Sequence, residues 1–216
     1  MENIKFGDKY SYLDYGLILT KKTIGVPEKK SQIVNIPGSH GQINLANYMG
    51  EPKYSNRALK FEFETIMRQD DFMQLFSQIE NDLQGKELKV ILDIDKDFYY
   101  VGEIKVNPWE SDRVIGKLVI DVDAQPFKYK HNKTIYSAMI NGRVVIDLMN
   151  LRQWSIPTFN FSNKVNLTFE NETYANLEGE INGDDYDIIF KEGINRVIVD
   201  AKDATLITIS YQEGGL

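Results

Sequence analysis

The sequence predicts a mainly β protein with a single helix. Three observations support this class: apolar and polar residues alternate in many short runs, one segment alone changes to helical spacing, and a bend rich in glycine and proline joins two β-prone runs. Alternation is clearest in the run that ends at Glu64, where charged residues separate Leu59, Phe61 and Phe63. Because successive side chains of a strand point to opposite faces, this run predicts a half-buried strand.

The same period of two recurs along the chain, so strands dominate the prediction. The other alternating or β-prone runs are Leu88–Ile94, Leu118–Val122, Val144–Leu148, Val165–Phe169, Tyr186–Phe190, Val197–Val199 and Leu206–Tyr211. The last of them leaves two alternatives open. It completes the sheet of the C-terminal half, or it returns to the N-terminal half.

One segment has the apolar spacing of a helix. Its apolar residues are three or four positions apart, or adjacent, as on one face of a helix: Phe72, Leu75, Phe76, Ile79 and Leu83. Asp70 is expected to cap the first turn, and its charge suits the positive end of the helix dipole. Gly85 is expected to supply the left-handed residue that ends the helix. The spacing therefore predicts a helix from about Asp70 to Gln84.

Two segments suggest how the chain is organised. The bend Ile36–Gly41 joins β-prone runs at Gln32–Ile36 and Gln42–Leu45, which predicts a hairpin or protruding arm over about residues 30–47. The turn-like segment around Pro126, followed by a polar and basic stretch to Lys133, predicts a domain boundary. We therefore expect an N-terminal domain at residues 1–129 and a C-terminal domain at residues 130–216.

Composition excludes several classes of function. The 216 residues include 25 basic and 32 acidic ones, for a net charge of −7, which argues against contact with nucleic-acid phosphates or an anionic membrane. There is no cysteine, so no disulfide, thiolate metal site or cysteine nucleophile exists. The N-terminus lacks the apolar stretch of a signal peptide, and no apolar run approaches the ~18 residues of a membrane helix. We expect neither a secreted chain nor membrane insertion.

Candidate chemical sites have simpler explanations. The carboxylates of Asp93, Asp95 and Asp97 have the spacing of a calcium loop, but Phe98 and Ile104 occupy the positions where that loop needs glycine and glutamate, so a hairpin turn is favoured over a weak cation site. The two histidines, His40 and His131, lie far apart in polar segments. No nucleophile elbow, zinc helix or phosphate-binding loop is present. We expect no catalytic, cofactor-binding or metal-binding residues, no cofactor, and no enzymatic activity.

Two alternatives involve carbohydrate. Aromatic residues make up 12% of the chain; most of them are expected to fill the core, but exposed ones can stack on sugar rings. Trp154, Phe159 and Tyr174 are the stacking candidates if residues 130–216 form a module that binds cell-wall carbohydrate. A weaker alternative is a glycoside hydrolase, since acidic residues are numerous enough for two carboxylates to lie ~5–10 Å apart.

A series of motifs in order resembles the distal tail protein family of siphophages that infect Gram-positive bacteria. The resemblance covers residues 4–130 and continues more loosely to Gly193–Asn195. Its motifs are Phe6–Gly7, Tyr15–Leu17, Pro27, Ile36–Gly41, Tyr54–Arg57, the helix end Asn81–Lys86, the turn from Asp93 to Tyr100 followed by Gly102, and Asp123–Tyr129.

This resemblance implies a structural protein of the phage tail tip. Its N-terminal domain would be a tail-tube-like β-sandwich with one helix and a hairpin arm, and its C-terminal domain a small galectin-like β-sandwich. Six copies would form a ring that connects the tail tube protein to the tail-associated lysin or tail fibre hub, and in some phages to receptor-binding proteins. The resemblance further implies passage of DNA through the ring without sequence-specific binding, and assembly in the host bacterial cytoplasm.

Overall fold

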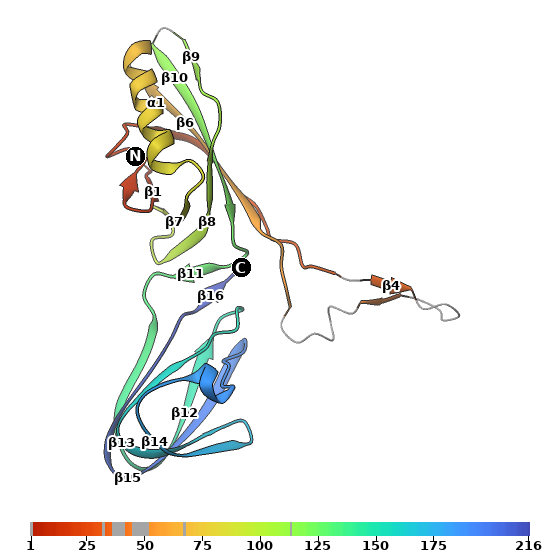
Figure 1. The fold of residues 1–216 in the computed structure, drawn as a ribbon, viewed down its shortest axis with the longest axis vertical. Coiled ribbons are helices and arrows are strands. Elements are labelled where there is room, and N and C mark those ends of the chain that lie inside the picture. Colours follow the sequence, from red (N-terminus) through yellow and green to blue (C-terminus); the bar gives the residue numbers. More distant parts are fainter. Residues whose placement is uncertain (1, 32, 36–41, 45–51, 67, 113) are drawn as a thin grey trace. The chain divides into compact units, whose positions relative to one another are not determined.

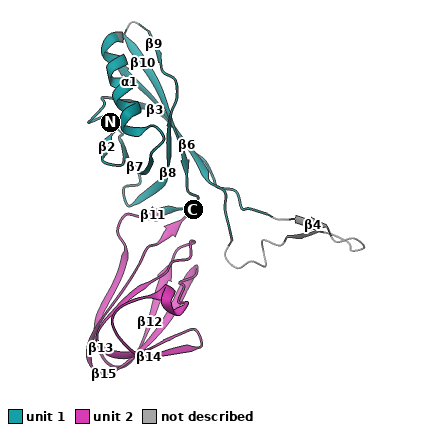
Figure 2. Cartoon of the chain, in the orientation of Figure 1, with its two compact units in different colours: residues 1–128, 216 teal, residues 129–215 magenta. Residues whose placement is uncertain are grey.

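The computed structural model describes residues 2–31, 33–35, 42–44, 52–66, 68–112 and 114–216. The mainly β prediction is confirmed: strands form two large antiparallel sheets and a small hairpin (Figure 1). The chain divides into two compact units, residues 1–128 with Leu216 and residues 129–215 (Figure 2). Each unit has its own hydrophobic core.

The N-terminal unit is built on a curved antiparallel sheet. Its strand order is β2-β1-β7-β8-β10-β6-β3, and β9 pairs with β10 at one end. The register of β6 and β10 pairs ten residues in an unbroken ladder from Arg57 opposite Ala124 to Ile66 opposite Ile115. The bounds are β1 Ile4–Phe6, β2 Lys9–Tyr10, β3 Ile18–Ile24, β6 Arg57–Ile66, β7 Glu87–Leu92, β8 Phe98–Val106, β9 Glu110–Ser111 and β10 Ile115–Ala124.

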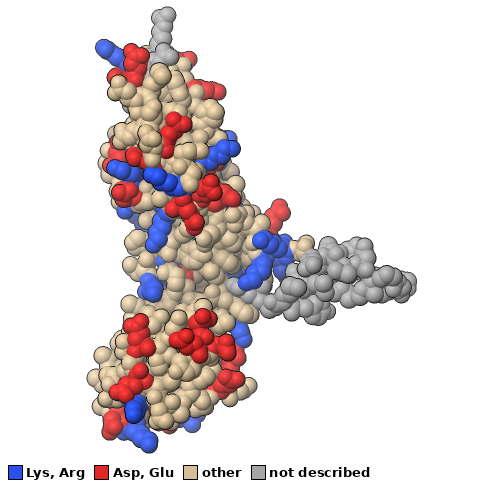
Figure 3. Space-filling view, in the orientation of Figure 1, with Lys and Arg blue, Asp and Glu red and all other residues tan. Residues whose placement is uncertain are grey.

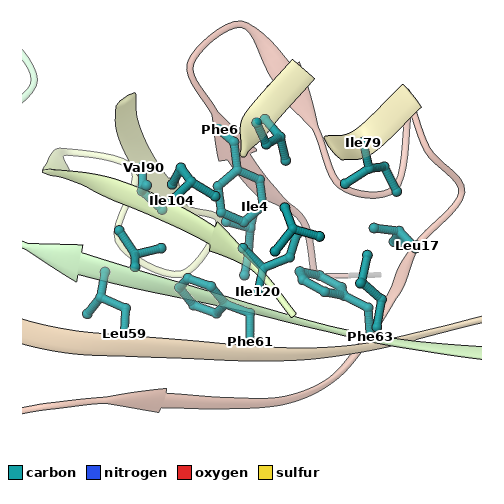
Figure 4. Close-up of a cluster of buried hydrophobic side chains, with 14 of the residues drawn as sticks. Ile4, Phe6, Leu17, Leu59, Phe61, Phe63, Ile79, Val90, Ile104 and Ile120 are labelled. Atoms are coloured by element: carbon teal, nitrogen blue, oxygen red, sulfur yellow. The ribbon is translucent and has the colours of Figure 1, made fainter. Parts of the chain in front are cut away.

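Alternation places one face of this sheet against the helix α1, Gln69–Leu83 (Figure 4). Phe61 and Phe63 of β6 are buried and contact Phe6 edge to face at centroid distances of 5.9 and 6.5 Å. Ile79 of the helix lies in the same cluster. The helix also needs a glycine beneath it, because a Cβ on Gly116 would lie 2.5 Å from the Phe72 ring.

The ends of the helix differ in part from the prediction. Gly85 has a φ of +67°, so the left-handed stop is confirmed. Asp70 is not the cap: Arg68 occupies that position and makes no side-chain capping bond, while Asp70 and Asp71 lie in the first turn. Their charge still complements the helix dipole. The expectation failed because the chain enters the helix about one residue earlier than its first aspartate indicates.

The hairpin turn predicted at Asp93, Asp95 and Asp97 is present: it joins β7 to β8. Leu88 pairs with Gly102 and Val90 with Tyr100. Ile94, which was expected to continue the strand, is 62% exposed and lies in the turn. The strand stops at Leu92 because Asp93 and the aspartates after it favour the bend over further pairing.

The predicted hairpin arm is also present in the described residues. β4, Ile33–Asn35, pairs antiparallel with β5, Gln42–Asn44, in the register that sets Val34 opposite Ile43. The bend at 36–41 and the ends of the predicted arm at Gln32, Leu45, Ala46 and Asn47 lie outside the described residues. At the base of the arm the outgoing and returning chains are joined by a bond from the Lys30 N–H to the Lys53 carbonyl, 2.8 Å long.

The C-terminal unit contains one antiparallel sheet of long strands in the order β12-β15-β13-β14. These are β12 Thr134–Asn150, β13 Thr158–Phe169, β14 Glu172–Asn182 and β15 Gly193–Tyr211; two short strands, β11 Lys128–Lys130 and β16 Gly214–Gly215, lie at the ends of the unit. The registers of β12, β13 and β15 all shift near Gly142 and Ala201. Such irregularities bend strands, so the sheet curves around its own apolar face.

The two halves of that sheet enclose a single core. Phe190 contacts both ends of β13, with centroid distances of 6.4 Å to Phe159 and 5.8 Å to Phe169. The run Tyr186–Phe190 was expected to be a strand, but it is not one. It begins at the last residue of a 3-10 helix, Gly183–Tyr186, and its only strand-like pairing in the described residues is a bridge between Phe190 and Ser155. Leu206–Tyr211 forms the second half of β15. Of the two alternatives left open by the sequence, this run therefore completes the C-terminal sheet.

Candidate functional surfaces

The aspartate-rich turn between β7 and β8 is held by lysines. Lys96 Nζ lies 3.1 Å from Asp93, and Lys128 Nζ lies 2.6 Å from Asp95. The Asp93 carboxylate also accepts a bond from the Asn3 N–H. The hydrogen bond from Lys96 is the main reason that the pKa of Asp93 is lowered. Through Asp93 and Asp95 the turn ties the N-terminus and the start of β11 to the sheet.

No group of acidic or histidine side chains in the described part of the chain could hold a metal ion. His131 is exposed and follows β11, while His40 lies outside the described residues. No helix within those residues is long and apolar enough to span a membrane.

The outer face of the N-terminal sheet carries interleaved charges. A hollow of about 270 Å³ there is lined by Glu62, Glu64, Glu110 and Lys117 among others. Lys117 lies 3.8 Å from Glu64, and Lys21 of β3 lies 3.5 Å from Glu62. Figure 3 shows the same mixture of signs over the visible face of this unit. Two glutamates of this face are therefore paired with lysines of neighbouring strands.

The three sugar-stacking candidates differ in exposure. Phe159 is fully buried in the core, so its assignment as a stacking residue is wrong: it lies on the inward face of β13. Trp154 is half-buried and lies under the Lys191 ammonium, 5.8 Å from the ring centroid. Tyr174 is half-buried, and its single hydroxyl donor lies within hydrogen-bond distance of the Tyr186 carbonyl (2.7 Å) and a Glu172 carboxylate oxygen (2.8 Å).

A buried guanidinium was not identified from the sequence. Arg57 begins β6, is 5% exposed, and lies 5.4 Å from the centroid of the Tyr100 ring. Its Nε and Nη2 have no hydrogen-bond partner, and burial lowers its pKa. The sequence gives no sign that this arginine is buried. Its place in the alternating strand predicts an inward direction, but a long arginine side chain at such a position can still extend its charged end to water.

This chain is similar to known proteins in structure but not detectably in sequence. No protein-family model matches it, and no curated protein sequence matches it. A conserved protein of unknown function from Pseudomonas aeruginosa PAO1 aligns over 90% of this chain and 100% of that chain, with 7% identity and a TM-score of only 0.30. The Dit protein of phage SPP1 aligns over 100% of both chains with a TM-score of 0.70 and 12% identity. That protein is described as a paradigm of the hub of the adsorption apparatus in phages that infect Gram-positive bacteria. The chain therefore has the fold of the SPP1 Dit protein along its entire length.

Proposed function

We propose that this protein is a structural component of a phage tail tip that forms a hexameric ring between the tail tube and the adsorption apparatus. The full-length likeness to the hub protein of SPP1 carries this proposal. The ring would be formed by residues 1–129, with the small C-terminal domain, a galectin-like sandwich in residues 130–216, on its outside. The protein would act at the virion tail tip without enzymatic activity, after assembly in the host cytoplasm.

The strand edges of the N-terminal unit support an assembly of identical subunits. The outermost strand β3 pairs with β6 on one side only within the described residues, and exposed apolar side chains lie at its C-terminal end, Ile24 and Val26. A closed ring of subunits in head-to-tail contact covers such an edge on every copy.

The hairpin arm offers a second contact. In the described residues β4 and β5 pair only with each other, and an isolated two-stranded hairpin is marginally stable in water. A neighbouring subunit would supply the surface on which it packs. The tail tube protein and the tail-associated lysin or fibre hub are the partners proposed for the two faces of the ring, with receptor-binding proteins as further partners.

The charge distribution suits the passage of DNA without retention. Residues 1–129 contain 17 basic and 20 acidic residues, and lysines on the outer sheet face are paired with glutamates. Lysines that are paired with glutamates are less available to bind phosphates and release counterions. DNA would therefore pass through the ring without sequence-specific binding.

Electron microscopy and light scattering of the concentrated full-length protein test the ring. Six-fold particles are expected, and tails that contain this chain should show it in a ring below the tube. Deletion of residues 32–45 should raise the dissociation constant of the ring about tenfold or more, while circular dichroism should show that both units stay folded. Absence of six-fold particles in both preparations would end the proposal.

A carbohydrate-binding C-terminal domain is the second candidate. A hollow of about 350 Å³ is lined by Glu170, Lys191, Asn195 and neighbouring residues, and Lys191 also lies over Trp154. Polar groups beside a half-exposed indole are typical of sugar sites. Calorimetric titration with host wall polysaccharides should give heat that Trp154→Ala abolishes and Ile135→Ala leaves unchanged. No heat with any polysaccharide would exclude this function.

A further inference from the structure

One edge of the C-terminal sheet is apolar on its exposed side. β12 is an outermost strand that pairs only with β15 in the part of the chain that the structure describes, so half of its backbone groups face away from the sheet. Four outward apolar side chains of β12 are exposed by 53–68%: Ile135, Met139, Val145 and Met149. Leu206 of β15, opposite Met139, and Ile194, opposite Met149, extend the apolar band.

The other edge of the same sheet is protected. β14 presents Glu172, Glu178 and Glu180 among its exposed residues. Charged side chains on an outermost strand oppose pairing with another chain. The β14 edge therefore carries charges that oppose pairing, whereas the β12 edge carries an apolar band. This difference indicates that β12 pairs with a strand of another molecule.

We propose that β12 is covered by β12 of a second copy of this chain, paired antiparallel about a two-fold axis at Gly142. The outward side chains of β12 read the same in both directions, apolar at Ile135, Met139, Val145 and Met149 and polar at Ser137, Asn141, Arg143 and Asp147. In this register Ile135 lies opposite the partner's Met149, and Met139 lies opposite the partner's Val145. Ser137 lies opposite the partner's Asp147, and Asn141 opposite the partner's Arg143.

The bend in β12 selects this register. The ladder between β12 and β15 shifts at Ile140/Gly142, and Gly142 has a φ of +83°. When the axis passes through Gly142, both strands bend at the same level and the ladder continues on either side. Full overlap also brings all four apolar residues of each copy into cross-strand pairs, which are the stabilising unit of a sheet.

A competing register is centred on Val145. It sets Arg143 opposite the partner's Asp147, a favourable pair of charges. However, Asp147 already accepts two hydrogen bonds from Arg196, at 2.7 and 2.9 Å. The bends would also fall at different levels, and Met149 would lie opposite the partner's Asn141. The structure therefore favours the axis at Gly142.

This pairing goes beyond the proposed ring and is independent of it. The ring would use the N-terminal unit and multiply the mass by six, whereas the β12 pair uses the C-terminal sheet and multiplies it by two. Pairs without rings, or rings without pairs, would separate the two proposals.

Cysteine cross-linking tests the register, because the chain contains no cysteine of its own. In the double variant Met139→Cys/Val145→Cys, each cysteine lies opposite one on the partner, within the ~4.4–6.8 Å Cα separation that a disulfide spans. In each single variant the two cysteines are six residues apart along the ladder, about 20 Å. Mild oxidation of the full chain should therefore give a two-chain product from the double variant only.

The control for non-specific cross-linking is Ala175→Cys on the exposed side of β14. A double variant that cross-links no more than this control overturns the proposal. Cross-linking of Val145→Cys alone overturns it as well, because that result requires the register centred on Val145.

Sedimentation of the unmodified chain tests the association itself. A concentration-dependent doubling of mass is expected, and Met139→Lys should raise its dissociation constant at least tenfold while Ala175→Lys leaves it unchanged. If the full chain shows no doubling at any concentration, the proposal fails.

Discussion

The two units bury similar alternating strands in different ways. In the N-terminal unit a separate layer, helix α1, covers one face of the sheet. In the C-terminal unit no comparable helix lies among the described residues, and the sheet bends until its two halves enclose the same core. The difference shows that alternation specifies which face is buried but leaves open what covers it.

The largest expected effect distinguishes the two cores. Phe61→Ala should destabilise the N-terminal unit, and Phe159→Ala the C-terminal unit, each by about 3–5 kcal/mol, because both rings are fully buried. Scanning calorimetry should show each substitution lowering the transition of its own unit. Equal shifts of a single common transition would mean that the units unfold as one.

Two glycines sharpen the same comparison. Gly116→Ala should destabilise the N-terminal unit by about 1–3 kcal/mol, because the added Cβ meets the Phe72 ring and displaces the helix. Gly142→Ala should cost about 1–2 kcal/mol for a different reason: there is open space around it, but its φ is +83°. Urea unfolding measures both. Gly116→Ser should repeat the first loss, and Gly142→Asn, which tolerates the left-handed region, should recover part of the second.

The smallest effect concerns alkaline pH. Burial raises the pKa of Tyr211 to about 12, and its hydroxyl donates to the Met149 carbonyl at 2.5 Å. Because the folded state favours the neutral phenol, its contribution to stability is complete below the unfolded pKa near 10 and is lost as pH rises through about 12. Stability of the C-terminal unit should fall over this window in the wild type and less in Tyr211→Phe.

Tyr15 gives the matched measurement in the N-terminal unit. Burial is the main cause that raises its pKa, and its hydroxyl donates to Asp82 at 2.9 Å. Tyr15→Phe should reduce the loss of stability of the N-terminal unit at alkaline pH and leave the loss of stability of the C-terminal unit unchanged. If stability falls equally at alkaline pH in the wild type and in both variants, groups other than Tyr15 and Tyr211 cause the fall.

The sequence was sufficient where local pattern decides structure. It predicted the mainly β class, the buried face of β6, the helix within about a residue at each end, and the paired strands of the arm. It failed where a strand meets a turn, as at Ile94, and where an apolar run forms only a single bridge, as at Phe190. It also named Phe159 among three candidates for sugar stacking although the residue is buried, since an aromatic residue in an alternating run can point either way.

What the sequence determined by itself is therefore the period of each segment, because side-chain direction follows from backbone geometry within a few residues. Tertiary structure alone decided that β15 joins two runs into one strand, that Arg57 is buried, and that β12 lies at an edge while β13 lies inside. These outcomes depend on strand order, and strand order is set by contacts between residues far apart in the chain. No local pattern encodes those contacts, and the apolar edge of β12 became visible only when its neighbours were known.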